Sequence, residues 1–244
     1  MNLTITLATT RRILAQLRHD HRTIAMMVVV PALLMILLRY VFDRPGAFDG
    51  IGPMLLGLFP FVIMFIVTSV GTLRERTGGT LERLMTLPIG KLDLLMGYAL
   101  AFGLVALVQV GVVLTISLTW LDLDLTGPVW ALVVVALLDA LLGMALGLFA
   151  SAFARTEFQA VQFMPAFVLP QALLCGLIVP RERMASWLEL TSDVLPLSYA
   201  VDAMKEVAAE PDVGGTLVRD MMIIAACALL ALVLGAATLP RRTA

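Results

Sequence analysis

Residues 73–98 read LRERTGGTLERLMTLPIGKLDLLMGY, a compact charged segment between two long apolar stretches. The rest of the chain is dominated by apolar runs, since hydrophobic residues make up 60% of it and charged residues only 14%. A soluble domain is about 45–50% apolar and about 25% charged, so this chain lacks the polar residues needed to coat a water-exposed surface. We therefore predict a membrane protein in which this segment is a polar hairpin between two spans.

The apolar runs are continuous rather than alternating, which favours helices over the strands of a membrane barrel. Because about 20 apolar residues span a bilayer as a helix, we predict an all-α membrane protein with six transmembrane helices, forming one domain over residues 1–244. The predicted spans are residues 24–42, 51–73, 94–120, 128–154, 158–179 and 221–239.

The distribution of positive charge predicts the orientation. With a cytoplasmic N-terminus, eleven of the 17 Lys and Arg residues lie on the cytoplasmic side and five on the outer side, with Arg39 inside the first span. This bias predicts a multi-pass protein of the cytoplasmic (inner) membrane with both termini in the cytoplasm.

Two segments outside the spans are also expected to be helical. Residues 1–22 carry a short apolar stripe (Ile13, Leu14 and Leu17) among arginines, which is typical of an amphipathic helix on the cytoplasmic membrane face. A frayed basic tail that only sets the topology is the alternative. Residues 180–220 are expected to form short extracellular helices before the last span.

Residues 77–88 carry the signals of a short cytoplasmic helix. Gly78 and Gly79 permit a turn, Thr80 is a suitable N-cap, and Glu82 falls in the first turn, where the helix dipole favours an anion. Leu81, Leu84 and Met85 form one apolar face, and Pro88 ends the helix. A helix of about two turns is not stable alone, so we expect it to dock on a partner. An ordinary loop that orients two spans would explain the arginines but not the other signals.

This pattern, followed by a basic residue and a new span, resembles the permease subunits of ABC-2-type exporters. The resemblance extends over essentially the whole chain, because the basic N-terminal helix, the broken fifth span and the outer Leu195–Tyr199 stretch also fit the family. It implies that residues 77–88 are a coupling helix held in a groove of a separate ATP-binding subunit. The residues carried over to that role are Glu75, Gly79, Thr80, Leu81, Glu82, Leu84 and Pro88.

The resemblance also implies the partners and the cargo. A second permease chain, identical or related, would complete the pathway in the lipid, and two ATP-binding subunits would bind ATP and Mg and do the hydrolysis. The sequence has no GxxxxGK[ST] phosphate loop, so this chain is expected to be no enzyme itself. The expected cargo is a hydrophobic drug-like, lipid or glycan substrate, as in multidrug or antibiotic resistance. No cofactor, metal or nucleic acid is expected to bind this chain.

Polar residues inside the spans are the candidate pathway residues: Asp139, Gln109, Gln162 and Gln171. Asp139 falls near the membrane midplane, where a carboxylate is costly. Asp139 has one of two roles: it lines the substrate route, or it forms a structural hydrogen bond to a neighbouring helix, for example to Gln109. Gly143, Gly147 and Ser151 follow at intervals of four and form a stripe suited to close helix packing.

Two other classes of function fit less well. An ion-coupled secondary transporter without an ATPase partner would need paired ionisable groups at membrane depth, and only Asp139 lies at the midplane. An intramembrane enzyme would need a nucleophile and a base there, yet no predicted span contains a histidine.

Overall fold

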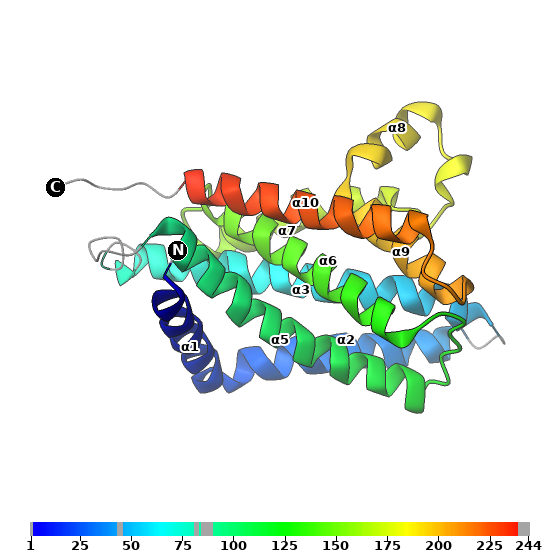
Figure 1. Ribbon diagram of the computed structural model, residues 1–244, viewed down its shortest axis with the longest axis horizontal. Coiled ribbons are helices and arrows are strands. Elements are labelled where there is room, and N and C mark those ends of the chain that lie inside the picture. The colour runs from blue at the N-terminus through cyan, green and yellow to red at the C-terminus, as the bar shows by residue number, and fades with distance from the viewer. Residues whose placement is uncertain (1, 43–45, 81–82, 84–89, 239–244) are drawn as a thin grey trace.

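The computed structural model describes residues 2–42, 46–80, 83 and 90–238, and within these residues it is helical, with no β-strand (Figure 1). The helices in chain order are α1 (Leu3–His19), α2 (His21–Val41), α3 (Ala47–Thr77), α5 (Lys91–Thr119), α6 (Val129–Ser151), α7 (Glu157–Leu174), α8 (Ser186–Val194), α9 (Pro196–Ala209) and α10 (Gly215–Ala237). A short 3-10 turn, η1 (Arg181–Arg183), precedes α8.

Five of these helices, α2, α3, α5, α6 and α10, are long and apolar enough to cross a membrane. Large apolar side chains stand exposed along them, for example Leu33 at 52%, Val108 at 61% and Leu229 at 62%. Contiguous apolar surface of this kind needs an apolar surrounding, so the chain is a multi-pass membrane protein. The prediction of an all-α membrane protein is confirmed, and five of the predicted spans correspond to these helices.

The fifth predicted span, residues 158–179, corresponds to α7, which is not among those five helices. It has 18 residues, and Pro165 and Pro170 lie within it. The helix ends at Leu174 because Gly176 adopts a left-handed φ of +84° and turns the chain. The predicted span therefore runs too far at its C-terminal end.

The last helix begins at Gly215, earlier than the predicted residue 221. Glu206 of α9 accepts hydrogen bonds from the Thr216 hydroxyl (2.6 Å) and the Leu217 N–H (3.2 Å). Donors at a helix start have no partner within the helix, so this carboxylate stabilises a polar first turn that hydropathy alone does not reveal.

The seam between α3 and α6 holds the bundle together, and its geometry explains the glycine stripe. A Cβ atom on Gly143 would lie 2.2 Å from the Phe61 carbonyl oxygen, and one on Gly147 would lie 2.3 Å from that of Phe65. The two backbones therefore touch directly, as small residues allow in membrane helix pairs. The predicted packing role of this stripe is confirmed.

The first helix crosses one end of the bundle at a steep angle (Figure 1). It is a regular helix rather than a frayed tail. Ile13 is 3% exposed, and Leu14 and Leu17 pack against the same apolar cluster, so the predicted stripe faces other helices of the chain. The residues around α1, the end of α3 from Arg74 to Gly79, and the start of α5 are called the base below.

The opposite end of the bundle carries residues 175–214, which include η1, α8 and α9 and are called the cap (Figure 1). Helices α3, α5, α6, α7 and α10 run from the base toward the cap, and α9 of the cap packs against α3, α6 and α10.

Candidate functional site

The turn that follows α3 is the part of the predicted coupling segment that the structure describes. Gly79 has a φ of +72°, and the Gly78 N–H donates to the Arg74 carbonyl (2.9 Å), so the Gly-Gly turn is confirmed. The Arg83 N–H donates to the Gly79 carbonyl (3.1 Å), which makes Gly79 rather than Thr80 the N-cap. The other coupling candidates lie outside the described residues: Leu81, Glu82, Leu84 and Pro88.

Glu75, in the last turn of α3, is the centre of the base. Its carboxylate accepts two hydrogen bonds from the Arg12 guanidinium of α1, at 2.9 and 3.3 Å, and one from the Tyr98 hydroxyl of α5. The side chains of Arg12 and Glu75 are only 26% and 12% exposed. Glu75 therefore joins three helices, and its carboxylate is occupied within the chain.

The charge of Glu75 also favours the protonated form of Arg12. Partial burial alone would lower the pKa of Arg12, but the hydrogen bond and the negative charge of Glu75 outweigh it and raise that pKa. Arg12 therefore stays protonated, and the bidentate pair keeps its geometry.

The neighbours of Glu75 reach two further helices. Arg74 forms a bidentate pair with Glu157 at the start of α7, at 2.8 and 2.9 Å. Arg76 donates to the Ser151 carbonyl at the end of α6 (2.7 Å). Three consecutive side chains thus connect the end of α3 to α1, α5, α6 and α7.

Helix α1 is fixed to the start of α5 by backbone contacts. The Asn2 N–H donates to Asp93 (2.8 Å), and the Thr10 hydroxyl lies 3.2 Å from the Gly97 carbonyl to which it donates. Gly97 allows this approach, because a Cβ there would lie 2.6 Å from the Thr9 side chain. The threonine-rich face of α1 is therefore the face that packs.

A cleft of about 470 Å³ opens at the base between α1, α2, α3 and α5. Its walls are mainly apolar, and Asp20, Arg74 and Glu75 lie at its polar part. Hydrogen bonds from the Thr23 hydroxyl and N–H lower the pKa of Asp20, so this carboxylate is ionised at neutral pH.

The structure does not bring the four candidate pathway residues together in this cleft. Asp139 and Gln109 are fully buried, and among the described residues neither side chain has a hydrogen-bond partner. The hydrogen bond expected between them is therefore wrong. Gln171 is 5% exposed and donates to the Phe167 carbonyl of its own helix (3.0 Å), whereas Gln162 is exposed on α7.

Asp139 lies where α6 meets α3 and α9. A Cβ on Gly57 of α3 would be 3.6 Å from the Asp139 Oδ2 atom and 3.3 Å from Met204 of α9. An ionisable side chain at this depth without a partner marks a functional candidate rather than a packing device.

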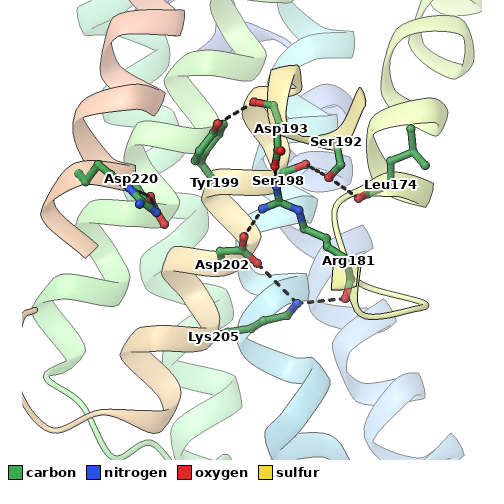
Figure 2. A network of polar contacts seen from close by, with 11 residues as sticks. Leu174, Arg181, Ser192, Asp193, Ser198, Tyr199, Asp202, Lys205 and Asp220 are labelled. Carbon is green, nitrogen blue, oxygen red and sulfur yellow. Dashed lines mark hydrogen bonds and ion pairs between the residues drawn. The ribbon is translucent and has the colours of Figure 1, made fainter. Parts of the chain in front are cut away.

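The cap holds a separate polar network, shown in Figure 2. Arg181 pairs with Asp193 and with Asp202, and Lys205 donates to the Gly176 carbonyl (3.1 Å). Further contacts connect α7, α8 and α9: Ser192 to the Leu174 carbonyl (2.8 Å), Ser192 to Ser198 (2.9 Å), and Tyr199 to the Asp193 carbonyl (2.6 Å).

Sequence reasoning missed the partners of Glu75. Arg12 was assigned only to a topological role, and Tyr98 was treated as part of an apolar span. A tyrosine close to the start of a span and an arginine on the inner face of an amphipathic helix are the signals that could have suggested a polar contact.

A comparison with protein families decides the identity of this arrangement. The model described as ABC-2 type transporter matches residues 4–208, from α1 into α9. The chain belongs to the ABC-2 type transporter family.

Curated relatives of this ABC-2 transporter chain carry names of the same kind. It is 28% identical over 155 residues to "Probable multidrug ABC transporter permease YbhR" of Escherichia coli, covering 64% of this chain and 42% of that protein. It is 28% identical over 150 residues to "Linearmycin resistance permease protein LnrN" of Bacillus subtilis, covering 61% of this chain and 39% of that protein. It is 26% identical over 169 residues to "ABC transporter G family member 20" of Dictyostelium discoideum, covering 68% of this chain and 23% of that protein.

The aligned part covers less than half of each of these relatives. The resemblance seen in the sequence is confirmed at the level of the family and of permeases named for drug or antibiotic resistance. In this ABC-2 transporter chain, the base is the region that lies next to the predicted coupling segment.

Proposed function

We propose that this chain is the permease subunit of an ATP-driven exporter and that a separate subunit binds and hydrolyses ATP with Mg. The family match over residues 4–208 carries the proposal. The names of its relatives support a role in moving drug-like compounds, with lipids and glycans as the other candidate cargoes. The chain itself acts as a transport subunit rather than an enzyme.

The coupling segment 77–88 docks on the ATP-binding subunit and passes its movement to the base. Gly79 turns the chain directly below α3, and Thr80, Leu81, Glu82, Leu84 and Pro88 form the docking element. Movement then reaches Arg74, Glu75 and Arg76, whose contacts with α1, α5, α6 and α7 support this route. In this mechanism Glu75 distributes force within the permease and makes no direct contact with the partner.

Helix α7 is the fifth of six spans in chain order, and both termini are cytoplasmic. Glu157 at its start pairs with Arg74 of the base, and Gly176 just after its end is contacted by Lys205 of the cap. Its 18 residues extend about 27 Å at 1.5 Å per residue, close to the hydrocarbon thickness. Six crossings also agree with Figure 1, in which α1 and the end of α10 lie at the same end of the bundle.

The working assembly contains two permease chains, identical or related, and two ATP-binding subunits, in the inner membrane. The substrate pathway runs between the permeases. Asp139, Gln109 and Gln171 lie buried on the inner side of their helices, and Gln162 is exposed on α7.

The decisive experiment is transport by the reconstituted complex in inverted vesicles. Uptake of fluorescent hydrophobic dyes and labelled phospholipids should require hydrolysable ATP and should persist when a protonophore removes the proton gradient. Glu75→Gln should abolish ATP-driven uptake while leaving ATP binding intact, and Glu210→Gln, at an exposed position of the cap, should have no effect.

Uptake driven by an imposed proton gradient without ATP would favour the ion-coupled alternative. The buried, unpartnered carboxyl of Asp139 is the observation on which that alternative rests.

A further inference from the structure

The cleft at the base shares Arg74 and Glu75 with the coupling route described above, but its apolar walls take no part in that route. It is bounded by one face of α2, which includes Met26, Met27 and Val30, and one face of α3, which includes Ile63 and Val67. Its volume of about 470 Å³ lies within the range of about 300–1,000 Å³ that is usual for small-molecule sites. The space is therefore large enough for one compact organic molecule.

The back wall of the cleft contains two closely packed aromatic side chains, which are only 3% and 4% exposed. Tyr98 and Phe102 of α5 both line it, with ring centroids 6.2 Å apart and planes 14° from parallel. Methionine side chains on the opposite wall adapt to ligands of different shape. Ring faces carry a negative quadrupole, so such a wall attracts an organic cation more strongly than an anion.

The charged side chains at the polar part of the cleft differ in whether they form an ion pair. Glu75 is paired with Arg12, and Arg74 is paired with Glu157. Asp20 accepts hydrogen bonds from Thr23 and from the Arg22 backbone, and it feels the charge of Arg74, but it forms no ion pair with any described residue. Among the charged side chains of the lining, Asp20 is therefore the one without an ion pair of its own, and Arg74, which is already paired with Glu157, compensates its charge only in part.

The basic residues beside Asp20 in the sequence do not remove this charge from the cleft. Arg18 and Arg22 are exposed and are not part of its lining. Charges in solvent are screened by salt over about 8–10 Å, whereas a ligand in the cleft would meet the Asp20 carboxylate at close range.

We propose that this cleft binds a lipophilic organic cation, with its apolar body between α2 and α3, its charge near Asp20 and its rings against Tyr98 and Phe102. As a substrate site it rests on the proposed export function, but the binding itself needs neither ATP nor a partner subunit. The site would select amphiphilic cations that enter from the cytoplasmic side of the chain.

The test uses two probes of the same shape and opposite charge, tetraphenylphosphonium and tetraphenylborate. Binding to the full chain in lipid nanodiscs is measured by equilibrium dialysis, with empty nanodiscs subtracted. Saturable binding of tetraphenylphosphonium is expected, and tetraphenylborate should not compete for that site.

Two variants locate the site. Gly71 lines the cleft and a side chain there would meet open space, so Gly71→Phe should fill the cleft without a clash and abolish saturable binding. Gly111 of α5 also faces open space and does not line the cleft, so Gly111→Phe is the matched control and should bind normally.

A third variant tests the charge. Asp20→Asn keeps a good N-cap for α2 and should weaken tetraphenylphosphonium binding about fivefold, the effect of one partly solvated charge pair. Thermal unfolding of all three variants checks that each is folded.

The outcomes separate this proposal from the proposed function. If Gly71→Phe still shows saturable binding of tetraphenylphosphonium, the cleft is not the binding site. If the unchanged chain binds tetraphenylborate and Gly71→Phe abolishes that binding, the cleft selects anionic amphiphiles and the proposed charge selectivity is wrong. Failure to bind any probe overturns the proposal as well, while ATP-driven transport by the complex would still stand. Conversely, binding without ATP-driven transport would overturn the export function alone.

Discussion

The base and the cap are both polar networks at the ends of an apolar bundle, but they connect the chain in different ways. In the base, Arg12 and Glu75 are 63 positions apart in the sequence and Arg74 and Glu157 are 83 apart. In the cap, Arg181 is only 12 and 21 positions from Asp193 and Asp202. The ion pairs of the base join distant helices, whereas those of the cap join neighbouring segments.

This difference assigns different mechanical roles to the two ends. A movement applied at Gly79 reaches α1, α5, α6 and α7 through side chains of a single helical turn. The ion pairs of the cap stay within the cap, but α9 also packs into the bundle core through buried residues such as Ala203, Met204 and Val207. Loss of an ion pair in the base should therefore loosen several helices, whereas loss of an ion pair in the cap should loosen mainly residues 175–214, because the apolar contacts of α9 remain.

The largest effect is expected from Glu75→Leu. This change leaves the Arg12 guanidinium partly buried without a counter-charge and Tyr98 without an acceptor, so it should lower the free energy of unfolding by about 3 kcal/mol. Denaturant titration in mixed micelles measures this loss, and hydrogen exchange should increase in both α1 and α5.

Glu210→Leu is the control, because that side chain is exposed. A loss below about 1 kcal/mol for Glu75→Leu, or faster exchange in only one helix, would contradict the role of Glu75 as a junction.

A smaller effect is expected from Arg181→Met in the cap. The change removes the cation shared by Asp193 and Asp202, and it should cost about 1.5 kcal/mol, as for hydrogen bonds to charged groups. Hydrogen exchange should increase within residues 175–214 and stay unchanged in α1. Faster exchange at the base would show that the two ends are coupled more tightly than the contact pattern indicates.

The exposed pair of the base should matter least among the ion pairs. Arg74 and Glu157 are 59% and 54% exposed, so Arg74→Met should cost only about 0.5 kcal/mol. Because salt screens exposed pairs, this difference should disappear at high ionic strength. A loss that persists in concentrated salt would mean that Arg74 is shielded in the membrane-embedded protein.

Asp139→Asn should leave stability nearly unchanged, since no described residue bonds to this carboxyl. The expected change is below about 0.5 kcal/mol, while export of at least one substrate should fall. Unaltered export of every substrate at a normal protein level would remove Asp139 from the pathway. A loss of about 2 kcal/mol would instead reveal a structural partner.

Much of the helical framework could be predicted from the sequence, because lipid requires long apolar helices and small residues where they meet. The five long helices, the turn at Gly79 and the contact surface at Gly143 and Gly147 all follow from these local rules. Patterns in the local sequence do not predict the bounds of a helix where a residue far away in the sequence stabilises its end. The early start of α10 depends on Glu206 of another helix, and hydropathy does not register such a contact.

The base was predicted only in part for the same reason. Periodicity identified the apolar stripe of α1, but it carries no information about which helix that stripe meets, so the pair of Arg12 and Glu75 was not foreseen. Asp139 and Gln109 show the opposite error: two polar residues in neighbouring spans suggested a hydrogen bond, but among the described residues neither buried side chain has a partner.

The direct backbone contact at Gly143 and Gly147 has a mechanical consequence. No side chain separates the two backbones at these two positions, so we expect α3 and α6 to move together there as one rigid unit. The 31 residues of α3 correspond to about 46 Å of helix, so a tilt of about 5° at the end near Gly79 would displace the far end by about 4 Å. A small movement at the base would thereby displace the opposite end by about the size of a side chain.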